Sequence, residues 1–253
     1  MKDKRRDTEK LEGAEIKLGS KSKAFAWLEN FWYHHKWKVI IIGFFAIVAV
    51  VGIVQMVKKT EPDISVIVAT HTIEFSDKQN VDALEGDLVA LMPSDLNGDG
   101  QKIITLKTYK IYSESELKEA NEAETDANGN PVIYADEAYN KEQIQQYNSY
   151  IGMGECSVMI ISEYLYNDMV SKRSDWLVPM TEIYGDSLPE GAVTYGIRLS
   201  EAGAYKNLES FGKVPDDAII CIKRPFVFST GDQQETFDFS VEYFKSIVAF
   251  GME

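Results

Sequence analysis

The chain has 253 residues, and 26 Lys and Arg against 40 Asp and Glu give it a formal net charge of −14 at pH 7. The acidic excess lies in residues 60–253, whereas the residues before 39 carry more basic than acidic side chains. Because phosphates repel an acidic surface, this composition argues against a nucleic-acid partner and against binding of residues 60–253 to an anionic bilayer face.

The first 38 residues change in character about halfway along. Residues 1–20 are charged, of mixed sign and poor in aromatic side chains, so we expect a disordered arm. Residues 21–38 are rich in aromatic side chains, and Phe25, Leu28 and Trp32 share one helical face. Trp and Tyr prefer the headgroup level of a bilayer, so this segment predicts an interfacial helix, with a docking face for a partner as the alternative.

A long apolar run begins at Val39 and ends at Val57, and Gln55 is its single polar side chain. A helix rises about 1.5 Å per residue, so residues 39–57 with their flanking lysines cross a hydrocarbon core of about 30 Å. The run predicts a single transmembrane helix, and the lipid bilayer is therefore an expected partner of the protein.

The lysines near this run predict its orientation. They are more numerous before it than after it: Lys21, Lys23, Lys36 and Lys38 against Lys58 and Lys59. We therefore expect a cytoplasmic amino-terminal arm and an extracytoplasmic domain over residues 60–253, held at the cell membrane. A cleaved signal peptide is the alternative, but its apolar core spans only about 7–15 residues and small residues follow it.

After residue 60, segments with strand patterns alternate with segments of helical period. The expected strands are 63–69, 101–112, 156–161, 193–199 and 218–223. The first expected helix begins after Ser76 and Asp77, and a second, short helix lies within 114–130. The remaining expected helices are 137–153, 163–170 and 235–250. This alternation predicts an α/β domain with one mainly parallel sheet flanked by helices.

The segment from Asp95 to Gly100 matches the first half of an EF-hand calcium loop. Asp95, Asn97 and Asp99 would supply side-chain oxygens and Gln101 its carbonyl. The second half of the motif is absent, because Leu106 stands where a bidentate Glu is needed. The alternative is a tight turn between a helix and a strand in which Asn97, Gly98 and Gly100 tolerate positive φ.

Cys156 and Cys221 lie on predicted buried strands, where a disulfide and two free thiols are both open alternatives. His71 is the single histidine after the apolar run, at the end of the first predicted strand. Ligands of open α/β sheets bind at such strand ends. No catalytic motif accompanies it, so we expect a protein that is not an enzyme and needs no cofactor, calcium apart.

The order of elements over residues 147–185 is similar to one lobe of type 2 extracellular or periplasmic solute-binding proteins. A helix leads through Gly152, Gly154 and Glu155 into a buried strand, and Leu177 lies in the apolar segment after the next helix. Ser157 stands where that family often carries Asp. The whole layout also resembles single-pass envelope proteins of Gram-positive bacteria, which implies a location and a fold but no activity.

Together these patterns predict a membrane-anchored extracytoplasmic binding module of solute-binding-like fold. We expect it to engage an envelope protein partner or a ligand of unknown identity. Two alternatives stay open. One is a calcium-dependent structural or adhesion module using Asp95, Asn97, Asp99 and Gln101, and the other is an envelope hydrolase using a carboxylate pair near His71.

Overall fold

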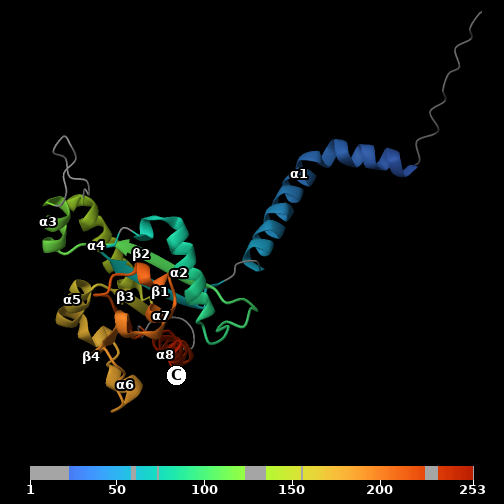
Figure 1. Cartoon of the computed structure of the whole chain (residues 1–253). Helices are drawn as coiled ribbons and strands as arrows, with labels where there is room; N and C mark the ends of the chain where they lie inside the picture. The colour runs from blue at the N-terminus through green and yellow to red at the C-terminus, as the bar shows by residue number, and fades with distance from the viewer. Residues whose placement is uncertain are drawn as a thin grey trace, which may run out of the picture. The chain divides into compact units, whose positions relative to one another are not determined.

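The computed structural model of the chain describes residues 23–57, 61–72, 74–122, 135–154, 156–225 and 233–252 (Figure 1). The chain divides into two compact units, Met1–Lys59 and Thr60–Glu253. The predicted disordered arm over residues 1–20 lies outside the described residues.

The first unit is described as one helix, α1 (Lys23–Val57), whose ribbon changes direction along its length (Figure 1). It covers most of the predicted interfacial segment and all of the predicted transmembrane run. Among the described residues it is the one helix long and apolar enough to cross a membrane, over Trp27–Val54, and no residue of that apolar window is buried inside the protein. A membrane anchor and a signal sequence both have this property.

The second unit is built on a six-stranded sheet with the order β2-β1-β3-β6-β5-β4. The strands are β1 (Ile64–Thr70), β2 (Ile104–Lys110), β3 (Val158–Ile161), β4 (Ala192–Val193), β5 (Gly196–Arg198) and β6 (Ile219–Ile222). β1 pairs in parallel with β2 and with β3, whereas the pairs β3–β6, β6–β5 and β5–β4 are antiparallel.

The expectation of a mainly parallel sheet is therefore wrong, because the sheet is mixed. The predicted strand 193–199 is interrupted at Thr194 and Tyr195, which connect β4 to β5. A two-residue connection permits an antiparallel pair only, since a parallel pair needs a crossover of about a dozen residues or more. The predicted alternation of strands and helices holds for β1 to α5, and the antiparallel half of the sheet follows.

Helices cover both faces of the sheet. They are α2 (Lys78–Ala90), α3 (Glu114–Glu122), α4 (Glu137–Met153), α5 (Glu163–Arg173), α6 (Met180–Tyr184), α7 (Gly203–Asn207) and α8 (Gln233–Ala249), with single 3₁₀ turns η1 (Glu74–Ser76), η2 (Ser174–Trp176), η3 (Leu199–Glu201) and η4 (Phe211–Lys213). Four of these helices begin with a side-chain cap, since Asp77, Ser113, Asp136 and Ser162 each accept a backbone N–H of the first turn.

Two apolar clusters form the core, one on each face of the sheet. On one face, Val66 and Ile160 pack with Leu84 of α2 and Phe244 of α8. On the other face, Ile67 and Met159 pack with residues of α4 and α5, among them Ile151 and Leu165. All seven residues of β1 are buried, so this strand lies at the centre of the unit. The residue that follows the carboxyl end of β1 is therefore held by a strand that is buried along its whole length.

Candidate functional site

The directions of β1, β3 and β6 bring the end of β1, the end of β3 and the start of β6 to the same edge of the sheet, where the strands terminate. Ala69 near the end of β1 pairs with Ile161 at the end of β3, and Ile161 pairs with Ile219 at the start of β6. β1 and β3 are parallel and therefore end at this edge, whereas the antiparallel β6 begins there. The residue that follows β1, His71, thus meets the turn that precedes β6, which contains Asp217.

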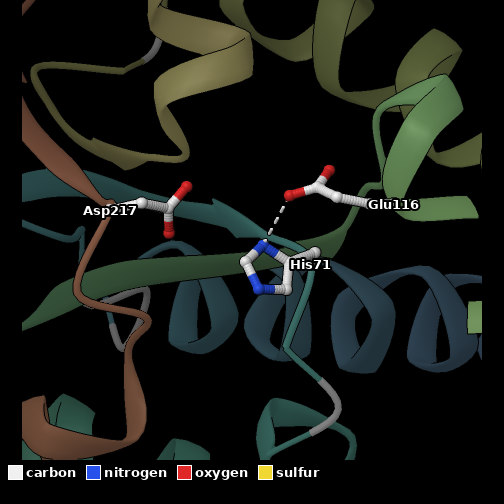
Figure 2. A group of neighbouring side chains, drawn as sticks. All are labelled: His71, Glu116 and Asp217. Carbon is white, nitrogen blue, oxygen red and sulfur yellow. Dashed lines mark ion pairs between the residues drawn. The ribbon is translucent and has the colours of Figure 1, made fainter. Parts of the chain in front are cut away.

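His71 is partly exposed, as 35% of its side-chain surface is accessible. Its Nδ1 lies 3.1 Å from Oε1 of Glu116, which is an ion-pair distance (Figure 2). Nδ1 nevertheless has no hydrogen-bond partner and is itself buried. The contact with Glu116 therefore brings a carboxylate beside the ring without satisfying the ring nitrogen. The ring of Tyr112 flanks His71, with 6.5 Å between the two centroids.

Glu116 is held by a reciprocal cap at the start of α3. Its Oε2 accepts the backbone N–H of Ser113 at 2.6 Å, and its own N–H donates to Oγ of Ser113 at 3.2 Å. This is the capping box, in which a Ser and a Glu three residues later satisfy each other's backbone donors. The cap engages one carboxylate oxygen, and the other oxygen, Oε1, faces His71.

Asp217 is held from the opposite side of the site. Its Oδ2 accepts the backbone N–H of Glu163 at 3.4 Å, and Glu163 is the first residue of α5. The unpaired N–H groups at a helix start favour a carboxylate in this place. Oδ1 of Asp217 is buried and has no hydrogen-bond partner. In Figure 2 this carboxylate and that of Glu116 lie on two sides of the His71 ring.

His71, Glu116 and Asp217 are the one group of at least three His, Cys, Asp or Glu residues, within the described ranges, whose ligand atoms lie within 4.8 Å of one another. Nδ1 of His71 and Oδ1 of Asp217 are also the two buried side-chain polar atoms without a hydrogen-bond partner in that part of the chain. Burying a polar group without a partner costs about 1–3 kcal/mol. Both such groups of this structure therefore meet in one cluster.

The predicted calcium residues lie elsewhere, in the loop between α2 and β2. Oδ1 and Oδ2 of Asp95 accept the N–H groups of Gly98 at 2.9 Å and Gly100 at 2.6 Å. These two bonds, that of Gly100 first, hold the pKa of Asp95 below its ordinary value. Asn97 Oδ1 accepts from the N–H of Asp99, and Asp99 Oδ1 accepts from the N–H of Gln101.

The loop of the predicted calcium site therefore has the form of a tight turn, with positive φ at Gly98 and Gly100 but not at Asn97. It leads into β2 and not into a second helix. A hollow of about 470 Å³ beside Asp95 is lined further by carboxylates of α8, among them Asp238 and Glu242. Calcium binding by Asp95, Asn97, Asp99 and Gln101 stays a prediction.

Both cysteines are buried free thiols on the second face of the sheet. Burial raises the pKa of Cys156 from 9.0 to about 12, against the smaller opposing effect of the Lys223 charge. Burial, and then the neighbouring Cys156, raise the pKa of Cys221 as well. Because the thiolate is the reactive form, neither residue is poised to act as a nucleophile.

The sequence pointed to His71 but did not reveal Glu116 or Asp217 as its neighbours. One local signal was available for Glu116, since Ser113 and Glu116 form a capping pattern directly after a strand that runs parallel to β1. Asp217 carries no comparable signal, because its place depends on the antiparallel direction of β6.

Comparison of this chain with protein-family models, with curated proteins and with solved structures finds no match. The geometry of the cluster is therefore the basis for a functional proposal.

Proposed function

We propose that the protein is a single-pass membrane protein whose residues 60–253 form an extracytoplasmic binding module. The module takes its ligand or envelope protein partner at the sheet edge where His71, Glu116 and Asp217 meet. The observation that carries this proposal is the presence in one cluster of two buried polar atoms without a hydrogen-bond partner, Nδ1 of His71 and Oδ1 of Asp217. A bound group that supplies the missing partners would recover the cost of burying them.

The place of the cluster supports a binding role. It lies beyond the carboxyl ends of two parallel strands, which is where open α/β sheets hold their ligands. The similarity of residues 147–185 to one lobe of solute-binding proteins points the same way. Each of the three side chains comes from a different segment, so the site forms only when the sheet and α3 have assembled.

The membrane location rests on α1. Its apolar window is unburied within the protein, and a helix of this length and composition is stable in a hydrocarbon core. The lysines before Val39 outnumber those just after Val57, which favours a cytoplasmic amino terminus. The Lys-Lys-Thr-Glu-Pro segment after the helix lacks the small residues of a signal-peptide cleavage site.

Binding accounts for the cluster better than catalysis does. Both thiols have raised pKa values, and no described hydroxyl group is hydrogen-bonded to His71. The second candidate is a hydrolase in which Glu116 and Asp217 act as the carboxylate pair near His71. It is favoured by the approach of both carboxylates to the imidazole. Hydrolysis of envelope glycans or esters that Glu116→Gln abolishes would replace the binding proposal with this one.

Site-specific photocrosslinking in cells that express the full chain tests the binding role. A photoreactive phenylalanine at Tyr112, whose ring flanks His71, should form an adduct with one partner or ligand. The control position is Met153, which is 62% exposed and ends α4 on the side where β3 begins. The absence of an adduct at Tyr112, or the same adduct from both positions, would contradict the proposal.

The mass of the protein recovered from washed membranes tests the anchor. We expect the intact chain, with α1 retained, in the membrane fraction after alkaline extraction. A soluble product that begins after residue 57 would identify α1 as a signal sequence instead.

A further inference from the structure

We infer that the cluster of His71, Glu116 and Asp217 is a binding site for a divalent transition-metal ion, with zinc as its representative. The inference rests on the proposed function, because it takes the same sheet edge as the binding site and names the class of its ligand. The three ligand atoms are Nδ1 of His71, Oε1 of Glu116 and Oδ1 of Asp217.

The separations of the ligand atoms suit a metal ion. Zinc binds nitrogen and oxygen at about 2.0–2.2 Å in tetrahedral geometry, so its ligand atoms lie about 3.4 Å from one another. In this structure Nδ1 of His71 and Oε1 of Glu116 are 3.1 Å apart, and all three residues offer ligand atoms within 4.8 Å. Shifts of about 1 Å at the tips of the side chains therefore bring the three ligand atoms to the separations that zinc requires.

The hydrogen bonds around the cluster leave the ligand atoms available. The second oxygen of Glu116 is held by the N–H of Ser113, and the second oxygen of Asp217 by the N–H of Glu163. Metal sites commonly orient their carboxylates by such outer hydrogen bonds. Here each carboxylate keeps one oxygen engaged with the backbone, while Oε1 of Glu116 faces His71 and Oδ1 of Asp217 has no hydrogen-bond partner.

A hydrogen-bonded network without a metal does not explain the cluster equally well. The imidazole nitrogen lies beside a carboxylate at 3.1 Å, yet the two groups form no hydrogen bond. Oδ1 of Asp217 is an acceptor that no described donor reaches. A cation at the centre satisfies a nitrogen lone pair and two carboxylate oxygens at the same time, whatever their mutual direction.

The donor set selects the class of ion. One imidazole and two carboxylates suit zinc, manganese, iron or nickel, whereas calcium and magnesium prefer oxygen ligands throughout. The two cysteines are buried in the core with Met159 and do not contribute sulfur to this edge. Three protein ligands leave at least one coordination position, which the proposed partner or ligand can occupy.

Calorimetric titration of the metal-stripped full chain in detergent micelles with zinc chloride tests the inference. We expect one zinc per chain at the site, with an affinity that falls by about tenfold or more in each of His71→Ala, Glu116→Gln and Asp217→Asn. His35→Ala, on α1, is the matched control that should bind as the parent chain does. Zinc uptake that survives His71→Ala, or no uptake by the parent chain, would overturn the inference.

Two further measurements keep the test independent of folding. Cobalt(II) should give a visible absorption spectrum of a four- or five-coordinate ion in the parent chain, and zinc should displace it. The metal-free variants should melt within about 2 °C of the parent chain, which corresponds to less than about 1 kcal/mol. A cobalt spectrum that is unchanged in Asp217→Asn contradicts the assignment of that ligand.

The crosslinking experiment separates this inference from the proposed function. An adduct at Tyr112 in a chain that binds no zinc would refute the metal site and leave the binding module in place. Zinc bound by all three residues in a chain that forms no adduct would refute the partner-binding role and leave the metal site.

Discussion

Asp63 and Ile103 exchange two hydrogen bonds. The N–H of Asp63 donates to the carbonyl of Ile103 at 2.8 Å, and the N–H of Ile103 donates to Oδ2 of Asp63 at 2.8 Å. Oδ1 of the same carboxylate accepts the N–H groups of Leu96 at 2.8 Å and Asn97 at 3.0 Å. One buried side chain thus joins the start of β1 to the middle and to the last residue of the loop between α2 and β2.

Replacement of this carboxylate should destabilise the domain strongly. Asp63→Ala leaves three backbone N–H groups without their acceptor, and we expect it to lower the free energy of unfolding by about 3 kcal/mol. The melting temperature of the full chain in micelles, followed by circular dichroism, should fall by about 6–12 °C. Asp99→Ala, which removes a single exposed bond to Gln101, is the control, and equal effects of the two changes would contradict the assigned role.

Substitution of Gly203 tests the contact between α7 and the residue that follows α8. A Cβ at this position would lie 1.9 Å from the backbone oxygen of Phe250, so Gly203→Ala must displace the main chain. We expect a loss of about 3 kcal/mol in the free energy of unfolding. Gly152→Ala in α4 meets no atom within 4 Å and should gain about 0.5–1 kcal/mol through a less flexible unfolded chain. Urea unfolding compares the two, and a neutral Gly203→Ala would refute the contact.

The buried thiols should be unreactive in the folded protein. Cys156 and Cys221 are free and fully buried, so a thiol reagent at pH 8 should label neither within minutes. After unfolding, two thiols per chain should react both with and without prior reduction. A count below two in the unreduced chain would show a disulfide instead.

The same thiols should make the domain less stable at alkaline pH. Burial raises the pKa of Cys156 from 9.0 to about 12, and that of Cys221 is raised too. An acid with a raised folded pKa binds its proton more tightly in the folded state, so its contribution is complete below pH 9 and falls as the pH rises toward 12. Each thiol should lower the free energy of unfolding by about 1 kcal/mol between pH 9 and 10, and the slope approaches about 1.4 kcal/mol per pH unit above that range.

Urea unfolding between pH 9 and 10 measures this slope below the ordinary tyrosine pKa of 10.0. Cys156→Ala should reduce the slope, although it also removes some packing. An unchanged slope in Cys156→Ala would refute the role of that thiol.

The calcium prediction for Asp95, Asn97, Asp99 and Gln101 is tested by thermal melting. A site with the affinity of extracellular modules, about 10⁻⁴–10⁻³ M, raises the melting temperature of the full chain in calcium at about 10 mM. Asp95→Asn should remove that rise, and magnesium at the same concentration is the control ion. A melting temperature that calcium leaves unmoved would exclude the site.

The sequence by itself determined the helices and strands that depend on local composition, hydrophobic period and capping residues. The apolar run from Val39 to Val57 predicts one long helix because its composition suits no soluble surface, and the structure has α1 there. The periodic patterns predict β1, β3 and the helix over residues 137–153, and Asp77 caps α2 as expected. The position of His71 directly after a buried strand was visible in the same way.

Only the tertiary structure decided the direction of β6 and the neighbours of His71. β6 pairs with β3 in the antiparallel direction, and no local pattern encodes which strand it joins or in which direction it runs. Glu116 and Asp217 are far from His71 along the chain, and they reach it because α3 is capped beside β1 and β6 starts where β3 ends. Local composition and periodicity therefore determined the long apolar helix and most of the other elements, whereas long-range packing determined the site.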